Sequence, residues 1–105
     1  MVHLLIIDDE STTRNGLLHH IDWKSLGIGM IQTADSGPKA IEICKSFRPD
    51  LILSDIRMRG MDGVETCRIL RSSYPDSEII FISGYSEKEY LKAAIELGAV
   101  NYIDK

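Results

Sequence analysis

Short apolar runs alternate along the chain with segments whose apolar residues recur at helical spacing. The runs, of which 28–33 is the least hydrophobic, lie at 4–7, 28–33, 51–53, 79–82 and 100–103. They are apolar almost without interruption rather than at every second residue, which predicts strands buried on both faces, as in a parallel sheet. Between the runs, apolar residues with helical spacing lie at 17–21, 40–47, 64–70 and 90–97. The alternation predicts a doubly wound α/β fold with helices on both faces of an open sheet.

Several predicted helix boundaries carry capping chemistry. Asp62 precedes Glu65 by three residues, and Ser86 precedes Glu89 by three. Each pair has the spacing of a capping box, in which the first side chain accepts a backbone N–H of the first turn. Gly98 follows the last apolar residue of the fourth helical segment, where a left-handed residue commonly ends a helix.

Polar residues follow four of the predicted strands directly. The first run leads into Asp8 and Asp9, the third into Asp55, the fourth into Ser83 and the last into Lys105. The carboxyl ends of parallel strands meet at one edge of the sheet, beside the topological switch point where ligands bind. We therefore expect these side chains to converge there, although the chain order of the segments leaves the strand order open.

The three aspartates point to a divalent cation and to phosphoryl chemistry. Like charges this close repel strongly unless a cation offsets them. An all-oxygen donor set without Cys or His favours Mg²⁺, and Mn²⁺ fits the same ligands. Asp55 is the predicted nucleophile, since it leaves the middle strand and precedes a loop, 56–63, that contains two glycines. A metal and an ammonium beside it suit in-line attack on a phosphoryl group.

Length, charge and cysteine usage narrow the class of protein. The chain has 105 residues, enough for one small domain, and its net charge of −4 argues against nucleic acid or an anionic membrane as a direct partner. Its apolar runs are far shorter than the roughly 18 residues of a membrane span, and no signal-peptide pattern precedes the first run, which predicts a cytoplasmic protein. Cys44 and Cys67 lack metal-ligand spacing and are predicted to be reduced core thiols.

The ordered set of these residues resembles the receiver domain of two-component response regulators. The resemblance covers essentially the whole chain. It rests on Asp8-Asp9, on Asp55 within Leu-Ser-Asp-Ile-Arg-Met-Arg-Gly-Met-Asp-Gly, on Ser83-Gly84, and on Tyr102 three residues before Lys105. It implies a flavodoxin-like, CheY-like five-stranded parallel sheet in the order 2-1-3-4-5.

The resemblance also implies roles for individual residues. Asp55 would accept a phosphoryl group from a phosphohistidine of a sensor histidine kinase. Asp9, Asp55 and the carbonyl oxygen of Arg57 would hold Mg²⁺, and Asp8 would act on the metal through water. The chain would be a signalling switch that catalyses only its own phosphorylation and dephosphorylation, not an enzyme with a separate substrate.

The same resemblance assigns the response to phosphorylation. Ser83 and Lys105 would bind the phosphoryl oxygens, and Tyr102 would be a switch aromatic that turns when Ser83 moves toward the phosphoryl group. This rearrangement would reshape the face formed by the fourth helix and fifth strand, through which a dimer would form.

Two segments, 20–27 and 83–85, resemble receivers attached to AraC-type helix-turn-helix output domains, which implies regulation of transcription by a linked domain. Residues 1–105 would then be a receiver domain that ends before the family's fifth helix, a helix whose absence would leave apolar surface on one face of the sheet. The chain departs from the family at Arg59, where Pro usually follows Met58. This departure frees the backbone of the loop and adds a cation at the mouth of the pocket.

An alternative is a Mg²⁺-dependent phosphotransferase or phosphatase of the haloacid-dehalogenase type, which also uses an Asp nucleophile on a Rossmann-like sheet. That chemistry normally places a second Asp two residues after the nucleophile as general acid and base. Arg57 occupies this position, so the sequence favours the receiver interpretation.

Overall fold

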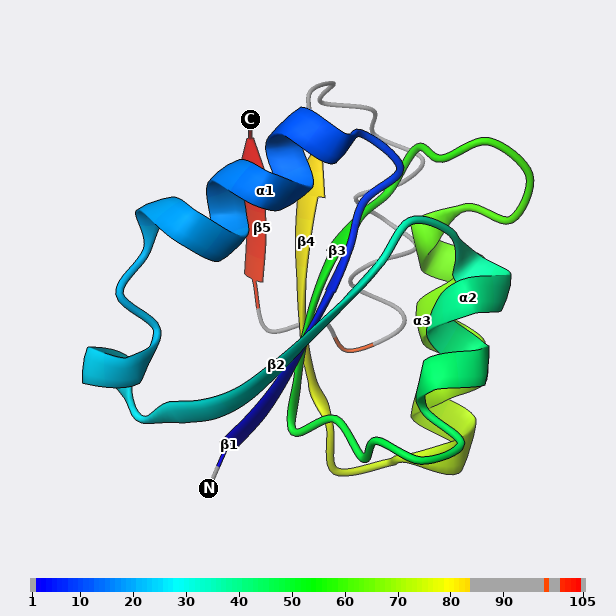
Figure 1. Cartoon of the computed structure of the whole chain (residues 1–105). Helices are drawn as coiled ribbons and strands as arrows, with labels where there is room; N and C mark the ends of the chain where they lie inside the picture. Colours follow the sequence, from blue (N-terminus) through cyan, green and yellow to red (C-terminus); the bar gives the residue numbers. More distant parts are fainter. Residues whose placement is uncertain (1, 84–97, 99–100, 105) are drawn as a thin grey trace.

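The computed structural model describes residues 2–83, 98 and 101–104. Strands and helices alternate in it, as predicted (Figure 1). In chain order the elements are β1 (Val2–Ile7), α1 (Ser11–His20), the 3-10 helix η1 (Lys24–Leu26), β2 (Ile28–Ala34), α2 (Gly37–Ile43), β3 (Leu51–Asp55), α3 (Gly63–Ser73), β4 (Glu78–Ser83) and β5 (Asn101–Asp104). The predicted fourth helix, with its expected start at Ser86 and Glu89, lies outside the described residues.

The strands form one parallel sheet in the order β2-β1-β3-β4-β5. This is the flavodoxin-like order that the resemblance implies, and the predicted fold is confirmed. The chain reverses direction across the sheet between β1 and β3, because β2 lies on one side of β1 while β3, β4 and β5 lie on the other. The switch point is therefore at the carboxyl ends of β1 and β3, where ligands bind in sheets of this kind.

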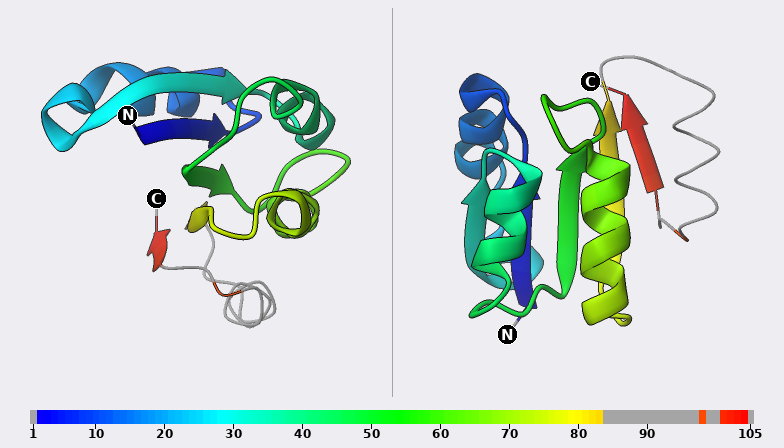
Figure 2. Two further views of the ribbon diagram at one scale, coloured as in Figure 1. Left: turned by 90° about the horizontal axis from the view of Figure 1, so that it is seen from below. Right: turned by 90° about the vertical axis from the view of Figure 1, so that its right-hand side faces the viewer.

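Successive residues of β1 enter two different apolar clusters. Leu5 and Ile7 pack in the larger cluster, which includes residues of α2 and α3, whereas Leu4 and Ile6 pack in a smaller one beside α1. All four side chains are at most 1% exposed. The continuous apolar run thus marks a strand covered on both faces, with α2 and α3 on one side and α1 on the other (Figure 2).

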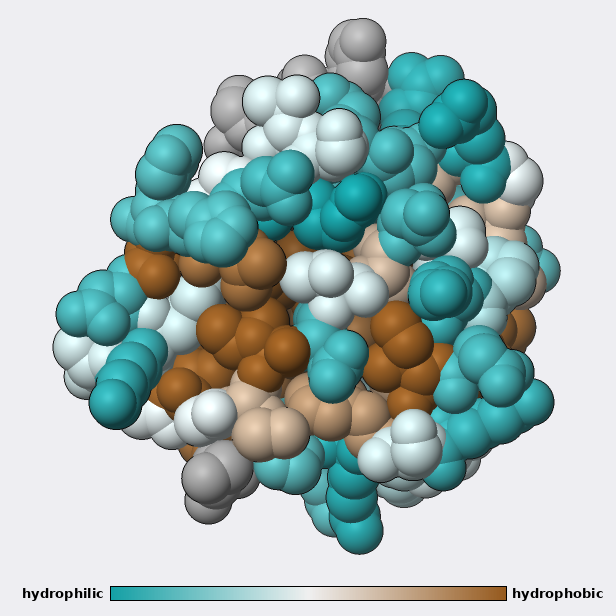
Figure 3. All heavy atoms as spheres, in the orientation of Figure 1, coloured by the Kyte–Doolittle hydropathy of each residue, from teal (hydrophilic) through white to brown (hydrophobic). Residues whose placement is uncertain are grey.

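The face that carries α1 is covered less completely. No residue of α1 is fully buried, and Leu51 and Ile80 of the neighbouring strands are only half-buried. Apolar side chains gather on the surface below this helix (Figure 3). Leu26 and Met30, on η1 and β2, are 66% and 44% exposed.

The helix ends agree in part with the sequence predictions. The Asp62 side chain accepts the backbone N–H of Glu65 at 2.9 Å and caps α3, as predicted. Gly98 has φ of +80°, the left-handed conformation predicted for this residue, and the helix predicted before it lies outside the described residues. By contrast, α2 ends at Ile43 and does not reach Phe47. The chain tightens after Ile43 into bonds between residues three apart, and Phe47 is buried from this turn rather than from a helix.

Both cysteines are free and buried, as predicted, with 3% of Cys44 and none of Cys67 exposed. Burial raises the pKa of the Cys67 thiol to about 12 and that of the Cys44 thiol to about 11. In the described part of the chain, no helix has the length and apolar character needed to cross a membrane.

Candidate functional site

Four carboxylates meet at the carboxyl edge of the sheet. Asp8, Asp9 and Glu10 follow β1, and Asp55 is the last residue of β3. Each offers an oxygen atom that lies within 4.8 Å of the others. Asp8 is 1% exposed and Asp55 is 5% exposed, so two of these charged groups are withdrawn from water. The convergence expected from the strand ends is present for the three aspartates, and Glu10 joins them.

Backbone N–H groups orient the two buried carboxylates. The N–H of Glu10 donates to Asp8 Oδ1 at 2.9 Å, and the N–H of Ile56 donates to Asp55 Oδ1 at 2.9 Å. Asp8 directly follows β1 and remains bonded to the neighbouring strand, since its N–H donates to the Ala34 carbonyl at the end of β2. Hydrogen bonds from backbone N–H groups fix a carboxylate more rigidly than those from long side chains, because a backbone donor has no side-chain rotamer entropy to lose. The local turns therefore prearrange the cluster.

Gly63, the first residue of α3, lies close against the backbone at the end of β3. The Gly63 N–H donates to the Ile56 carbonyl at 2.7 Å. A Cβ atom at Gly63 would overlap the Asp55 carbonyl oxygen. The same oxygen accepts the Ser54 hydroxyl at 2.8 Å. Only a glycine permits α3 to begin this close to the end of β3.

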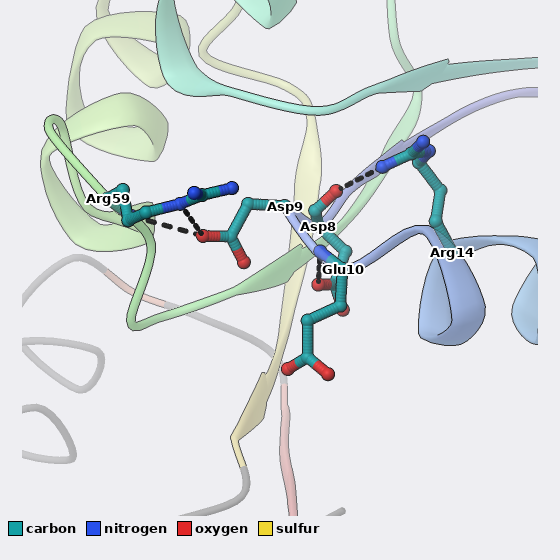
Figure 4. A network of polar contacts seen from close by, with 5 residues as sticks. All are labelled: Asp8, Asp9, Glu10, Arg14 and Arg59. Carbon is teal, nitrogen blue, oxygen red and sulfur yellow. Dashed lines mark hydrogen bonds and ion pairs between the residues drawn. The ribbon is translucent and has the colours of Figure 1, made fainter.

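Two arginines contact the cluster from different elements (Figure 4). Arg14, in α1, donates from Nη1 to the backbone carbonyl of Asp8 at 2.8 Å. Arg59, in the loop between β3 and α3, donates its backbone N–H to Asp9 Oδ2 at 3.1 Å. Its Nε lies 3.7 Å from the same oxygen. Arg14 thus holds the main chain of the site, and Arg59 holds a carboxylate.

The structure places the remaining predicted residues less completely. Ser83 is the last residue of β4 and pairs with Asp104, so it lies at the carboxyl edge of the sheet. Tyr102 lies within β5 and pairs with Phe81, but its side chain and that of Ser83 are outside the described part. Lys105 also lies outside the described residues. Arg57 is exposed in the loop after β3, between two buried residues.

Sequence reasoning missed two members of the site. Glu10 adjoins the two predicted aspartates in the sequence, and that adjacency was the available signal. Arg14 carries no motif, because its role depends on the turn of α1 that brings it back to the carbonyl of Asp8.

The donor set suits a hard divalent cation. It consists of carboxylate oxygens close enough to share one ion, without a thiolate or an imidazole among the described members. Such oxygen donors match Mg²⁺ and similar ions rather than zinc. The residues present therefore fit the predicted metal.

Comparison with known proteins assigns the chain to a protein family. Residues 4–105 match the model of the response regulator receiver domain. The chain is 34% identical over 105 residues to the uncharacterized transcriptional regulatory protein YesN of Bacillus subtilis; the match covers all of this chain but 28% of that protein. This chain thus spans less than a third of that relative's length.

Solved structures are similar over the whole chain. A two-component transcriptional regulator AraC from Clostridium phytofermentans has 47% sequence identity and a TM-score of 0.92, with 81% of its chain covered. The response regulator TrrA from Thermotoga maritima, solved in complex with Mg²⁺ and BeF, has 30% identity and a TM-score of 0.81, with 87% of its chain covered.

The relatives also decide between the two interpretations of the sequence. They are response regulators, including a transcriptional regulator of the AraC type, and nothing among them favours the haloacid-dehalogenase alternative. With its parallel sheet in the order β2-β1-β3-β4-β5 and a match over residues 4–105, the chain belongs to the response regulator receiver domain family.

Proposed function

We propose that the chain is a phosphorylation-activated switch in which Asp55 accepts a phosphoryl group from a sensor histidine kinase. One observation carries the proposal. In a chain of the receiver family, Asp55 ends the central strand and its buried carboxylate lies within 4.8 Å of three others at the ligand-binding edge of the sheet.

The chemistry is a transfer between two covalent bonds. A carboxylate oxygen of Asp55 forms a bond to phosphorus while the P–N bond of the donor phosphohistidine breaks, and its electron pair leaves with the imidazole, which takes up a proton. The carboxylate is oriented for this attack by the Ile56 N–H on Oδ1, so little motion is required of the nucleophile.

Asp9, Asp55 and the Arg57 carbonyl are the proposed ligands of Mg²⁺, with Asp8 acting on the metal through water, and Mn²⁺ fits the same set. When bound, the cation offsets the repulsion among the carboxylates and the charge on the phosphoryl oxygens. The complex of the related TrrA with Mg²⁺ and BeF supports this choice of metal. Glu10 adds a further negative charge at the edge of the set.

Ser83, Lys105 and Tyr102 are proposed to respond to the phosphoryl group. Ser83 ends the strand next to β3, so a shift of its backbone toward Asp55 would pass to β5, with which it pairs. Lys105 would bind a phosphoryl oxygen, and Tyr102 would turn into the space that Ser83 leaves. The proposed dimer face includes the fourth helix, which lies outside the described residues, and it remains a prediction.

The whole protein is proposed to carry an output domain. The curated relative is a transcriptional regulatory protein of which this chain spans 28%, and the structure with 47% identity is of an AraC-type regulator. Regulation of transcription through an AraC-type helix-turn-helix domain is therefore the output we propose. Membership in the receiver family supports the predicted cytoplasmic location.

The proposal is tested with acetyl phosphate as the phosphodonor, with and without MgCl₂. Wild type should gain one phosphoryl group that survives acid and is lost in base, as an acyl phosphate is, and only when the metal is present. Asp55→Asn should gain none. Asp76→Asn is the matched control, since Asp76 is exposed and precedes β4 at the opposite edge of the sheet; it should be labelled like wild type.

Normal labelling of Asp55→Asn would contradict the assignment of the nucleophile. Sustained turnover of a small phosphate ester by wild type, without accumulation of the phosphorylated protein, would contradict the assignment as a switch.

A further inference from the structure

Arg59 places a positive charge on one of the carboxylates of the acidic cluster. The Arg59 side chain is 91% exposed and that of Asp9 is 17% exposed, so the arginine lies at the solvent side of the pocket. Both its backbone N–H and its Nε approach the same oxygen, Oδ2, at 3.1 and 3.7 Å. The contact joins residues fifty positions apart in the sequence.

The two groups of Arg59 differ in what they do to Asp9. The backbone N–H is neutral and fixes the orientation of the carboxylate, whereas the guanidinium neutralises part of its charge. A divalent metal ion bound by Asp9 must share the carboxylate with the guanidinium of Arg59. The metal ion and the guanidinium are both positively charged and repel each other. Removal of the side chain leaves the N–H in place and so isolates the electrostatic effect.

Arg14 provides a contrast within the same cluster. Its guanidinium donates to a backbone carbonyl, not to a carboxylate. It can therefore hold the turn after β1 without contacting a carboxylate oxygen of the metal site. The two arginines of Figure 4 thus have different relations to a bound cation.

We propose that Arg59 is a built-in competitor of the divalent cation at Asp9, and that it sets the metal concentration at which the receiver becomes competent for phosphorylation. This inference rests on the proposed function, because it concerns the affinity of the proposed metal site. Its consequence is that metal affinity is limited by a residue outside the set of ligands.

Titration calorimetry with MgCl₂ tests the competition directly. In Arg59→Ala the Kd for Mg²⁺ should fall about two- to fivefold, the range expected from loss of an exposed ion pair. Arg59→Lys keeps the charge and should stay close to wild type. Arg48→Ala is the matched control, since Arg48 is exposed and precedes β3 at the opposite edge of the sheet; it should leave the Kd unchanged.

Ionic strength provides a second readout. Salt screens exposed charges over distances that shorten from about 10 Å at 0.1 M to about 3 Å at 1 M. The difference in Kd between wild type and Arg59→Ala should therefore shrink as KCl is added. A difference that arose from a changed loop conformation would persist.

The outcomes separate this inference from the proposed function. If wild type binds Mg²⁺ and is phosphorylated, but Arg59→Ala binds Mg²⁺ no more tightly, the competition is refuted and the switch stands. Weaker binding by Arg59→Ala would refute it as well and would make Arg59 a residue that positions Asp9. If wild type neither binds Mg²⁺ nor is phosphorylated, the proposed function itself fails.

Discussion

Gly63→Ala adds a single methyl group where α3 begins against β3. The added Cβ would overlap the Asp55 carbonyl oxygen and would lie 2.8 Å from the carbonyl carbon and 3.0 Å from Cα of Ile56. These are atoms of the main chain at the end of a central strand, so they cannot yield as the tip of a side chain can. Either α3 or the end of β3 must move.

The expected cost follows from the place of the contact. Overpacking by one methylene typically costs about 1–3 kcal/mol, and a contact with buried backbone belongs at the upper end, so we expect Gly63→Ala to lower the free energy of unfolding by about 3 kcal/mol. With a urea m-value of about 2 kcal/mol/M, the midpoint should fall by about 1.5 M. A shift of the end of β3 would displace Asp55 and should lower the rate of labelling by acetyl phosphate as well.

Gly16→Ala is the matched control for this substitution. Gly16 lies within α1, and a Cβ there would meet only the Nδ1 atom of His20, at 3.8 Å, an ordinary van der Waals contact. Replacing a helical glycine by alanine in open space should stabilise the fold by about 0.5–1 kcal/mol. Urea unfolding followed by circular dichroism measures both variants. If Gly63→Ala unfolds at the same urea concentration as wild type or higher, the argument from close contact is refuted.

Three further predictions concern the helix cap and the thiols. Asp62→Ala removes the acceptor of the Glu65 N–H and should lower the free energy of unfolding by about 1 kcal/mol; an unchanged urea midpoint would show that the cap contributes nothing. Because burial raises the thiol pKa values of Cys44 and Cys67 from 9.0 to about 11 and about 12, the unfolded chain loses these protons first as pH rises. Stability should therefore decline above about pH 9, and less so in the double variant Cys44→Ala/Cys67→Ala. In native protein near pH 8 iodoacetamide should react slowly with both thiols, whereas rapid alkylation without denaturant would contradict their burial.

The strands, the class of fold and the acidic edge can be predicted from the order of the residues. A run such as 4–7 is apolar at successive positions because both faces of β1 are buried, and that property is visible in the run itself. The aspartates at the strand ends converge because parallel strands share a carboxyl edge, whatever the order of the inner strands. The cap at Asp62 is equally local, since its partner is three residues away.

How this edge is completed depends on contacts between segments that are far apart in the sequence. The residues alone left the strand order open, and the family resemblance supplied it. The contact of Arg59 with Asp9 joins the loop between β3 and α3 to the segment after β1. The requirement for glycine at position 63 comes from how closely α3 approaches β3. Phe47 matches the helical spacing yet lies beyond α2. Periodicity reports that a side chain is buried, but what it is buried against depends on packing between segments that are distant in the sequence.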